Sequence, residues 1–271
     1  MIPSVLEYTK ASSLDEALAA VAAGATPLAG GQSLMPMMRL RLAAPGAVVD
    51  LGGVAELVGV CEDGDEIAVG AMTTHRAVAG DALLQQHAHV VSQAAEGVGS
   101  LQIRNRGTIG GSLAHADPHG DLPAALVAAG ASVIARGAGG ERRIAVADLI
   151  ESYLTTSLQP GELITQVRIP KGGAQSAYAK FHRRAIDWSI VGVGVCIGAD
   201  GVRAAATGVA DRPTRLTAFE GVLNGGGSLD DAVAVAADGL EPHADLDGST
   251  EYKQHLVGVL ARRAHEQASS R

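Results

Sequence analysis

A change of pattern after a proline- and glycine-rich segment most constrains how this chain can fold. The segment is Pro170-Lys171-Gly172-Gly173, the best candidate linker in the sequence. Helix-like and strand-like stretches alternate and mix before it. After it, runs typical of strands come first and runs typical of helices come last, which favours an α+β domain. The chain has 271 residues, and at this length two domains can each bury a core.

The first part predicts a helix near the N-terminus and several strands. Ser13 and Glu16 have capping-box spacing, and Gly24 ends the helix that they begin. Pro123 is placed for the first turn of a later helix. The further expected elements are strands 26–29, 47–51, 132–136, 142–146 and 163–169, a hairpin on 63–64 between strands 57–60 and 67–69, and helices 82–98 and 121–129.

The second part predicts a three-stranded antiparallel meander followed by helices. Its expected strands are 177–183, 190–197 and 202–209. Its expected helices are 215–223, 229–237 and 250–267.

Composition excludes several classes of protein. Lys and Arg total 21 against 29 Asp and Glu, and this net charge of −8 disfavours general nucleic-acid binding. Cys61 and Cys196 are far apart and outside any CxxC pair, so alone they can build neither an iron–sulfur cluster nor a structural zinc site. Cys196 lies in an apolar strand, where we expect an inert thiol. With no signal-peptide pattern and no membrane-length apolar run, we expect a cytoplasmic protein.

Two short Gly-Gly segments are the strongest candidates for binding a ligand through the backbone. They are Ala29–Leu34 (AGGQSL) and Thr108–Ser112 (TIGGS), in a chain with 35 Gly and only 3% aromatic residues. Consecutive amides without a Cβ can hold phosphate, and two such segments could hold one pyrophosphate. They could equally be tight turns that bind nothing. Neither matches a dinucleotide-binding or P-loop fingerprint.

The densest polar cluster runs from His115 to Asp121. Its two imidazoles and two carboxylates could ligate a divalent metal, but Pro118 prevents the helical spacing that puts two His on one face. Asp117 or Asp121 could instead accept a hydrogen bond from a ribose or ribityl hydroxyl. Asp121 could also cap the helix that follows it.

A third candidate segment, Lys180–Trp188, gathers cations beside the only Trp. It is either a solvated strand edge followed by a half-buried indole or a surface against a flavin or an anionic partner. No GxSxG or comparable pattern supplies a nucleophile. We therefore predict no catalytic side chain.

Taken together, these segments resemble the FAD-binding medium subunit of the molybdenum hydroxylases, the family of carbon monoxide dehydrogenase and xanthine dehydrogenase flavoproteins. The matching text is AGGQSL at 29–34, RNRGTIGGSLAHADP at 104–118 and the segment 180–188. The resemblance spans the whole chain, and the order and spacing of these motifs are more specific than any motif alone. We expect this chain to be a separate subunit and not a segment of a fused polypeptide, and the resemblance then favours the carbon monoxide dehydrogenase branch.

The resemblance implies an α+β fold: a two-subdomain, PCMH-type FAD-binding domain over 1–172, divided near residue 55 into 1–55 and 56–172, and a smaller C-terminal α+β domain over 173–271. FAD would lie between the subdomains, with both Gly-Gly segments on its pyrophosphate. The cofactor-binding residues so implied are Leu28, Ala29, Gly30, Gly31, Gln32, Ser33, Leu34, Ile103, Gly107, Thr108, Ile109, Gly110, Gly111, Ser112, Asp117, Asp121, Leu163, Ile164, Lys180 and Trp188.

The resemblance also implies partners. A large subunit would carry the molybdenum cofactor and the substrate site, and a small subunit would carry [2Fe-2S] clusters, assembled as a dimer of heterotrimers. This chain departs from the family at Ser112, where Asn is common, and at His119, where a small residue is common. Two alternatives remain open at this point: a metal-dependent hydrolase using His115, Asp117, His119 and Asp121, and a cofactor-free assembly protein of the same fold.

Overall fold

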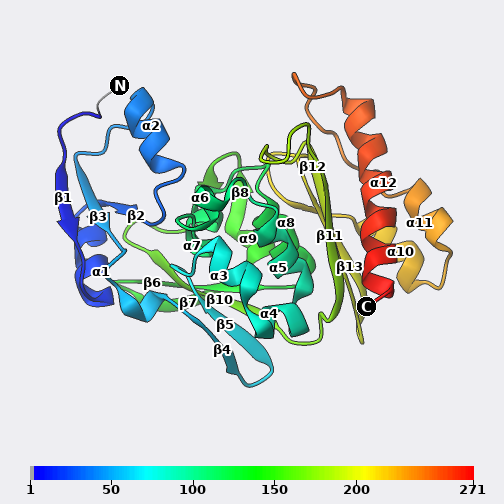
Figure 1. Ribbon diagram of the computed structural model, residues 1–271, viewed down its shortest axis with the longest axis horizontal. Coiled ribbons are helices and arrows are strands. Elements are labelled where there is room, and N and C mark those ends of the chain that lie inside the picture. The colour runs from blue at the N-terminus through cyan, green and yellow to red at the C-terminus, as the bar shows by residue number, and fades with distance from the viewer. Residues whose placement is uncertain (1–2) are drawn as a thin grey trace.

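The N-terminal part of the computed structural model, which describes residues 3–271, is built on a small parallel sheet (Figure 1). Its strand order is β1 (Glu7–Lys10), β3 (Ala47–Asp50) and β2 (Thr26–Leu28). Helices α1 (Leu14–Ala22) and α2 (Leu34–Leu40) connect the strands. The strands predicted at 26–29 and 47–51 are therefore confirmed.

Helix α1 begins and ends at the predicted residues, with one change in its cap. The Ser13 hydroxyl accepts a hydrogen bond from the Glu16 amide, as expected. The Glu16 carboxylate, however, accepts from the amide and hydroxyl of Ser12, each at 2.8 Å, instead of the Ser13 amide. Gly24, with φ +95°, lies where the chain leaves the helix.

The middle part contains a five-stranded antiparallel sheet. Its order is β4 (Val60–Asp63), β5 (Glu66–Gly70), β10 (Leu163–Pro170), β6 (Ser132–Gly137) and β7 (Gly140–Ala145). Residues 57–60 were expected to form the first strand of a hairpin, but Ala55–Leu57 form the 3-10 helix η1, so strand β4 starts at residue 60. Leu57 is buried in the N-terminal core, which explains the difference. Helix α9 (Val146–Leu149) and the strands β8 (Ile150–Ser152) and β9 (Thr155–Thr156) follow β7.

Short helices cover this sheet. They are α3 (His75–Gly80), α4 (Ala82–His87), α5 (His89–Glu96), α6 (Leu101–Arg104), α7 (Ile109–His115) and α8 (Asp121–Ala128). The single helix expected over 82–98 is two helices, since Ala88 adopts a non-helical conformation and forms a bridge with Gly173. Helix α8 is buried along all eight of its residues, because it also contacts strands of the C-terminal sheet.

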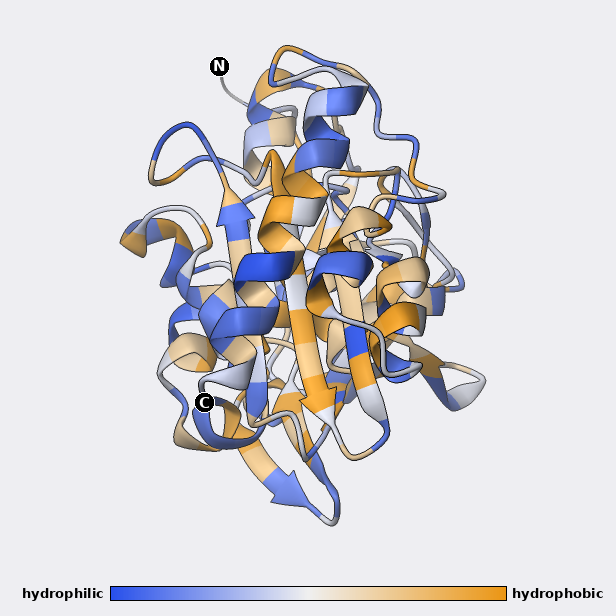
Figure 2. Ribbon diagram, turned by 90° about the vertical axis from the view of Figure 1, so that its right-hand side faces the viewer, coloured by the Kyte–Doolittle hydropathy of each residue, from blue (hydrophilic) through white to orange (hydrophobic). Residues whose placement is uncertain are grey.

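The C-terminal part is a second antiparallel sheet with helices on its outer face. The order is β11 (Gln175–Phe181), β12 (Val191–Gly198), β13 (Gly201–Thr207) and β14 (Thr214–Arg215). The expected three-stranded sheet thus gains a two-residue fourth strand. Helices α10 (Thr217–Asn224), α11 (Leu229–Ala234) and α12 (Thr250–Ser269) complete the chain. Figure 2 shows hydrophobic strands behind helices that carry hydrophilic residues, as expected for helices that pack one face on a sheet and expose the other to solvent.

Two further sequence expectations concern Cys196 and the membrane. Burial in β12 raises the pKa of the Cys196 thiol to about 12, so the thiol stays protonated and inert near neutral pH. Across residues 3–271, no helix has the length and apolar character of a membrane span.

Candidate functional site

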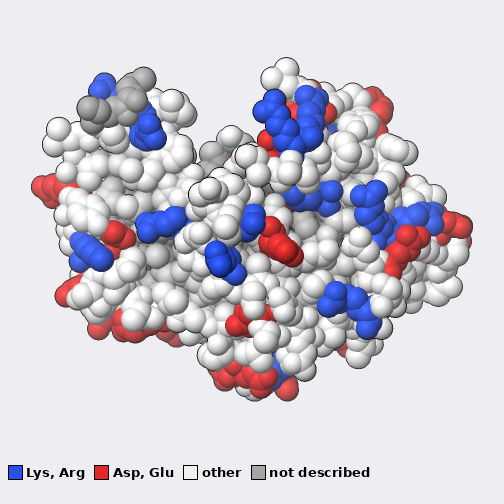
Figure 3. All heavy atoms as spheres, in the orientation of Figure 1, with Lys and Arg blue, Asp and Glu red and all other residues white. Residues whose placement is uncertain are grey.

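A cleft of about 500 Å³ brings together residues from all three parts of the chain. Figure 3 shows the surface hollowed between the N-terminal part and the rest of the molecule. The cleft is lined by the turn before α2, the start of α7, strand β10 and the loop after β11. These include 17 of the 20 predicted cofactor-binding residues, all except Leu28, Ile109 and Lys180.

The first Gly-Gly segment lies against the backbone that precedes α7. A Cβ on Gly30 would lie 2.1 Å from the Arg106 carbonyl oxygen and 2.7 Å from the Gly107 Cα. Gly31 has φ +74°, a conformation that favours glycine. Both glycines are therefore required by geometry, one for a close approach and one for the turn.

Five consecutive amides of this segment, residues 30–34, donate no hydrogen bond to any protein group among the described residues. The Gln32 side chain donates to the Gly30 carbonyl and so helps to fix the turn. Such a run of free amides beside a cleft matches the expected anion-binding nest.

The second Gly-Gly segment differs from the nest that the sequence predicts. It is the first turn of α7, with Thr108 as the N-cap. The Gly110 amide donates to the Ala71 carbonyl and the Gly111 amide donates to the Thr108 hydroxyl. The reason for glycine at 110 is packing, since a Cβ there would lie 2.6 Å from the Ala71 Cβ.

Polar groups of this second segment nevertheless face the cleft. Thr108, Gly111 and Ser112 line it. Among the described residues the Ser112 hydroxyl has no protein partner, while the Thr108 hydroxyl accepts one bond and retains its own proton to donate. The segment therefore offers hydroxyl donors where consecutive amides were expected.

Asp121 is the centre of a buried polar network. One carboxylate oxygen accepts from the Tyr178 hydroxyl at 2.8 Å and from the Ser189 hydroxyl, and the other lies 3.0 Å from Lys180 Nζ. Burial and the neighbouring carboxylate raise the pKa of Tyr178 well above its ordinary value. Gly120 is the N-cap of α8, so Asp121 does not cap that helix. Asp121 lines the cleft but is already paired, which limits the hydroxyl-binding role proposed for it.

The alternative metal site considered for His115 to Asp121 is not assembled. His119 Nδ1 is bonded to the Ser189 carbonyl, and the Asp117 carboxylate accepts from the His119 amide. His115 Nε2 lies 3.8 Å from Asp117. Within residues 3–271 no group of three or more His, Cys, Asp or Glu is placed to hold a metal ion. The hydrolase hypothesis therefore has no support in the structure.

The remaining predicted residues fall into two groups. Ile103, Leu163, Ile164 and Trp188 line the cleft as expected, and Trp188 is 59% exposed at its edge, not half-buried. The three residues outside the lining have other roles: Ile109 is fully buried in the core, Lys180 pairs with Asp121, and Leu28 faces a neighbouring cavity.

Some lining residues were missed by the sequence reasoning. Ala71 and Met72 follow β5, His75 is the first residue of α3, and Val98 and Gly99 precede α6. No motif marked His75. Its place in the cleft comes from a bridge between Thr74 and Thr108, a long-range contact that the sequence pattern does not reveal.

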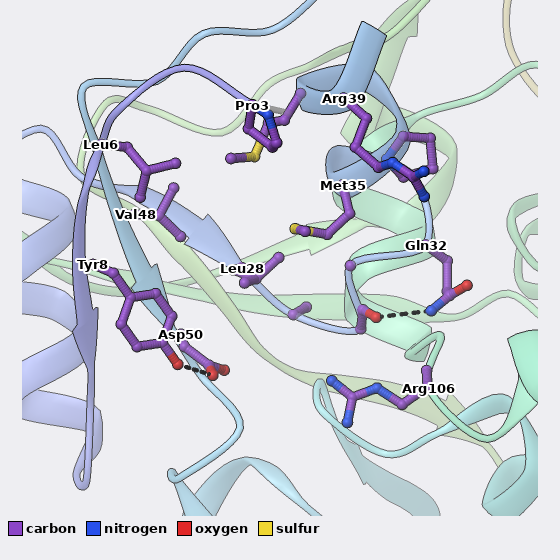
Figure 4. A pocket seen from close by; sticks show the side chains of 15 residues that line it. Pro3, Leu6, Tyr8, Leu28, Gln32, Met35, Arg39, Val48, Asp50 and Arg106 are labelled. Atoms are coloured by element: carbon purple, nitrogen blue, oxygen red, sulfur yellow. Dashed lines mark hydrogen bonds between the residues drawn. The ribbon is translucent and has the colours of Figure 1, made fainter. Parts of the chain in front are cut away.

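A second cavity of about 620 Å³ lies on the other side of the first Gly-Gly segment (Figure 4). Leu28, Met35 and Val48 form part of its wall, and Arg39 and Arg106 lie at its edge. The Tyr8 hydroxyl donates to Asp50 at 2.6 Å, which raises the pKa of Tyr8.

Comparisons with known proteins agree across the whole chain. Residues 4–172 match the family model for the FAD binding domain in molybdopterin dehydrogenase, and residues 176–268 match that for the CO dehydrogenase flavoprotein C-terminal domain. The carbon monoxide dehydrogenase medium chain of Afipia carboxidovorans is 35% identical, with 100% of this chain and 99% of the relative covered. The glyceraldehyde dehydrogenase medium chain of Sulfolobus acidocaldarius is 32% identical, with 99% of this chain and 100% of the relative covered. A solved carbon monoxide dehydrogenase structure from Hydrogenophaga pseudoflava has a TM-score of 0.94 at 34% identity. The match covers 100% of this chain and 99% of the solved chain.

Proposed function

This chain belongs to the FAD-binding medium subunits of the molybdenum-dependent dehydrogenases, and from that premise we propose that the cleft described above is its FAD site. The chain is an oxidoreductase component that transfers electrons through FAD, while molybdenum and iron–sulfur centres belong to other subunits. The observation that carries the proposed site is the run of five free amides at residues 30–34 beside the start of α7.

The donor set fits a pyrophosphate. A pyrophosphate is best held by N–H and O–H donors without a carboxylate opposite them, and residues 30–34 with Thr108 and Ser112 supply such donors. Because Gly30 has no Cβ, the first Gly-Gly segment lies directly against the backbone of Arg106 and Gly107, which brings the two sets of donors close together.

The apolar part of the lining suits the flavin ring. Val98, Ile103 and Ile164 offer aliphatic contacts, and Trp188 is the aromatic residue at the edge. When bound, a flavin can hold one or two electrons and so can couple single-electron donors to a two-electron acceptor. The residues of this chain hold and orient the cofactor, and no side chain has to act as an acid or base.

For the assembly, we propose that a large molybdenum-cofactor subunit and a small [2Fe-2S] subunit join this chain in a dimer of heterotrimers. The relatives are medium chains of multi-subunit enzymes, which supports partners of this kind. We also propose domain limits of 1–172, subdivided near residue 55, and 173–271. The ranges of the two family models support the limit near residue 172, and each part contributes most of the residues of one hydrophobic cluster. Cytoplasmic location stays a prediction from the sequence.

Flavin content tests the proposed function directly. We expect the full chain, alone or co-purified with its partners, to carry about one FAD, released by acid and quantified by absorbance. A folded chain that neither contains nor binds FAD would contradict the site and favour the cofactor-free assembly protein. A stoichiometric metal in the flavin-free chain would instead revive the hydrolase hypothesis.

A further inference from the structure

His75 is a buried imidazole that the roles assigned so far do not use. It is the first residue of α3, is 5% exposed and lines the cleft. Its amide donates to the Gly107 carbonyl at 2.9 Å, which fixes α3 beside the segment that leads into α7. The backbone of His75 is therefore held by Gly107, which immediately precedes the second Gly-Gly segment.

The two ring nitrogens of His75 have different surroundings. Nδ1 is shielded from solvent and has no hydrogen-bond partner among the described residues. Nε2 also has no protein partner in that part of the chain, but it is not among the shielded atoms. A Cβ on Gly107 would lie 2.9 Å from Nε2, so this edge of the ring lies directly against Gly107. Nε2 is thus the nitrogen that reaches the cleft.

The surroundings also select the tautomer. A buried N–H without an acceptor costs more than a buried lone pair, so the proton belongs on Nε2. Burial and the positive charge of Arg104 lower the pKa of His75 to about 4, so the ring is neutral near pH 7. His75 therefore presents one N–H donor to the cleft.

We propose that His75 binds FAD by donating a hydrogen bond from Nε2–H to a pyrophosphate oxygen. The position of the ring supports this proposal. Gly107 lies between the His75 ring and the first Gly-Gly segment, since a Cβ on Gly30 would lie 2.7 Å from the Gly107 Cα. His75, the free amides of 30–34 and the Thr108 hydroxyl then act on one anionic group from three segments. This inference rests on the proposed FAD site and adds a ligand residue to it.

The experiment compares FAD and riboflavin binding to variants of the full chain, prepared free of flavin. Loss of a hydrogen bond to a charged group predicts about tenfold or more weaker FAD binding for His75→Leu. His75→Gln, which can place an amide donor near the Nε2 position, should stay within about threefold of wild type. Riboflavin has no phosphate, so its affinity should be the same in all three proteins.

His89→Leu is the matched control. His89 also has a shielded, unpartnered Nδ1, but it lies on α5 outside the cleft lining, so FAD affinity should not change. Wild-type affinity for FAD in folded His75→Leu would overturn the inference, as would an equal loss of riboflavin affinity. Failure of the wild-type chain to bind FAD would instead reject the proposed function.

A second measurement needs no variant. In the wild-type chain labelled with ¹⁵N at histidine, the Nε2 resonance of His75 should report a protonated nitrogen and should shift when FAD is added. An Nε2 resonance that FAD leaves unchanged would overturn the inference even if His75→Leu does not fold.

Discussion

Gly30 makes the sharpest prediction at the scale of a single residue. In Gly30→Ala the new Cβ would meet the Arg106 carbonyl oxygen at 2.1 Å, so the turn must move away from the start of α7. We expect FAD affinity to fall at least about tenfold and stability to fall by about 1–3 kcal/mol. Equilibrium titration and urea unfolding measure the two effects.

Gly221→Ala is the control for that substitution. Gly221 lies within α10 with nothing inside 4 Å of an added Cβ. Alanine should stabilise this helix by up to about 1 kcal/mol and leave FAD binding unchanged. Wild-type FAD affinity in Gly30→Ala would show that this turn does not hold the cofactor.

The sequence identified the important glycines better than it identified what each one does. Gly30 and Gly31 have the roles expected of a close approach and a turn. Gly110 was expected to present a free amide, but that amide is bonded to Ala71, 39 positions earlier in the chain. Local sequence shows that a Cβ is absent, whereas the partner that fills the space is set by tertiary packing.

At the scale of an element, the caps of α3 and α7 form a matched pair. Thr74 and Thr108 are the N-caps, each accepting from the amide three residues later, and only Thr108 lines the cleft. Replacing either with Val should cost about 1 kcal/mol of stability. Thr108→Val should also weaken FAD binding by about tenfold, because it removes a donor to phosphate, whereas Thr74→Val should not. Equal FAD affinities in the two variants would exclude Thr108 as a ligand.

Among elements, the sequence predicted best where the signal is local. Strands with alternating apolar residues and helices with a Ser cap begin close to the expected positions, as at Ser13 and Ser249. The helix expected over 82–98 is interrupted because Ala88 pairs with Gly173, a long-range contact that the local sequence does not reveal. The same limit hid His75, whose place depends on pairing with the segment before α7.

At the scale of the whole molecule, the Asp121 network joins α8 to the C-terminal sheet. Asp121 and Lys180 are only 5% and 9% exposed, so removing one charge leaves the other buried without its partner. Asp121→Asn should destabilise the chain by about 3–5 kcal/mol, and adding Lys180→Met should recover part of that loss. Urea unfolding of the single and double variants measures the coupling. Purely additive losses would show that the pair does not hold the two parts together.

The pH dependence of stability is also a property of the whole molecule, and the contribution of His75 to it can be predicted. Its pKa is about 4 in the folded chain against the ordinary value of 6.5 for histidine, so the unfolded chain binds the proton more tightly. The stability due to the neutral ring is therefore present above pH 6.5 and is lost as pH falls toward 4. Between pH 7 and pH 5 this loss is about 2 kcal/mol.

Other buried histidines would also make the stability fall as the pH falls, so the measurement has to isolate the contribution of His75. Burial also lowers the pKa values of His89 and His265, and both add to the acid sensitivity. Comparing flavin-free wild type with His75→Gln removes their contribution, since both proteins keep them. The variant should lose less stability than wild type between pH 7 and pH 5, by about 2 kcal/mol in urea unfolding. Parallel pH profiles would mean that His75 is already charged in the folded chain, and the assignment of Nε2–H as a neutral donor would fail with it.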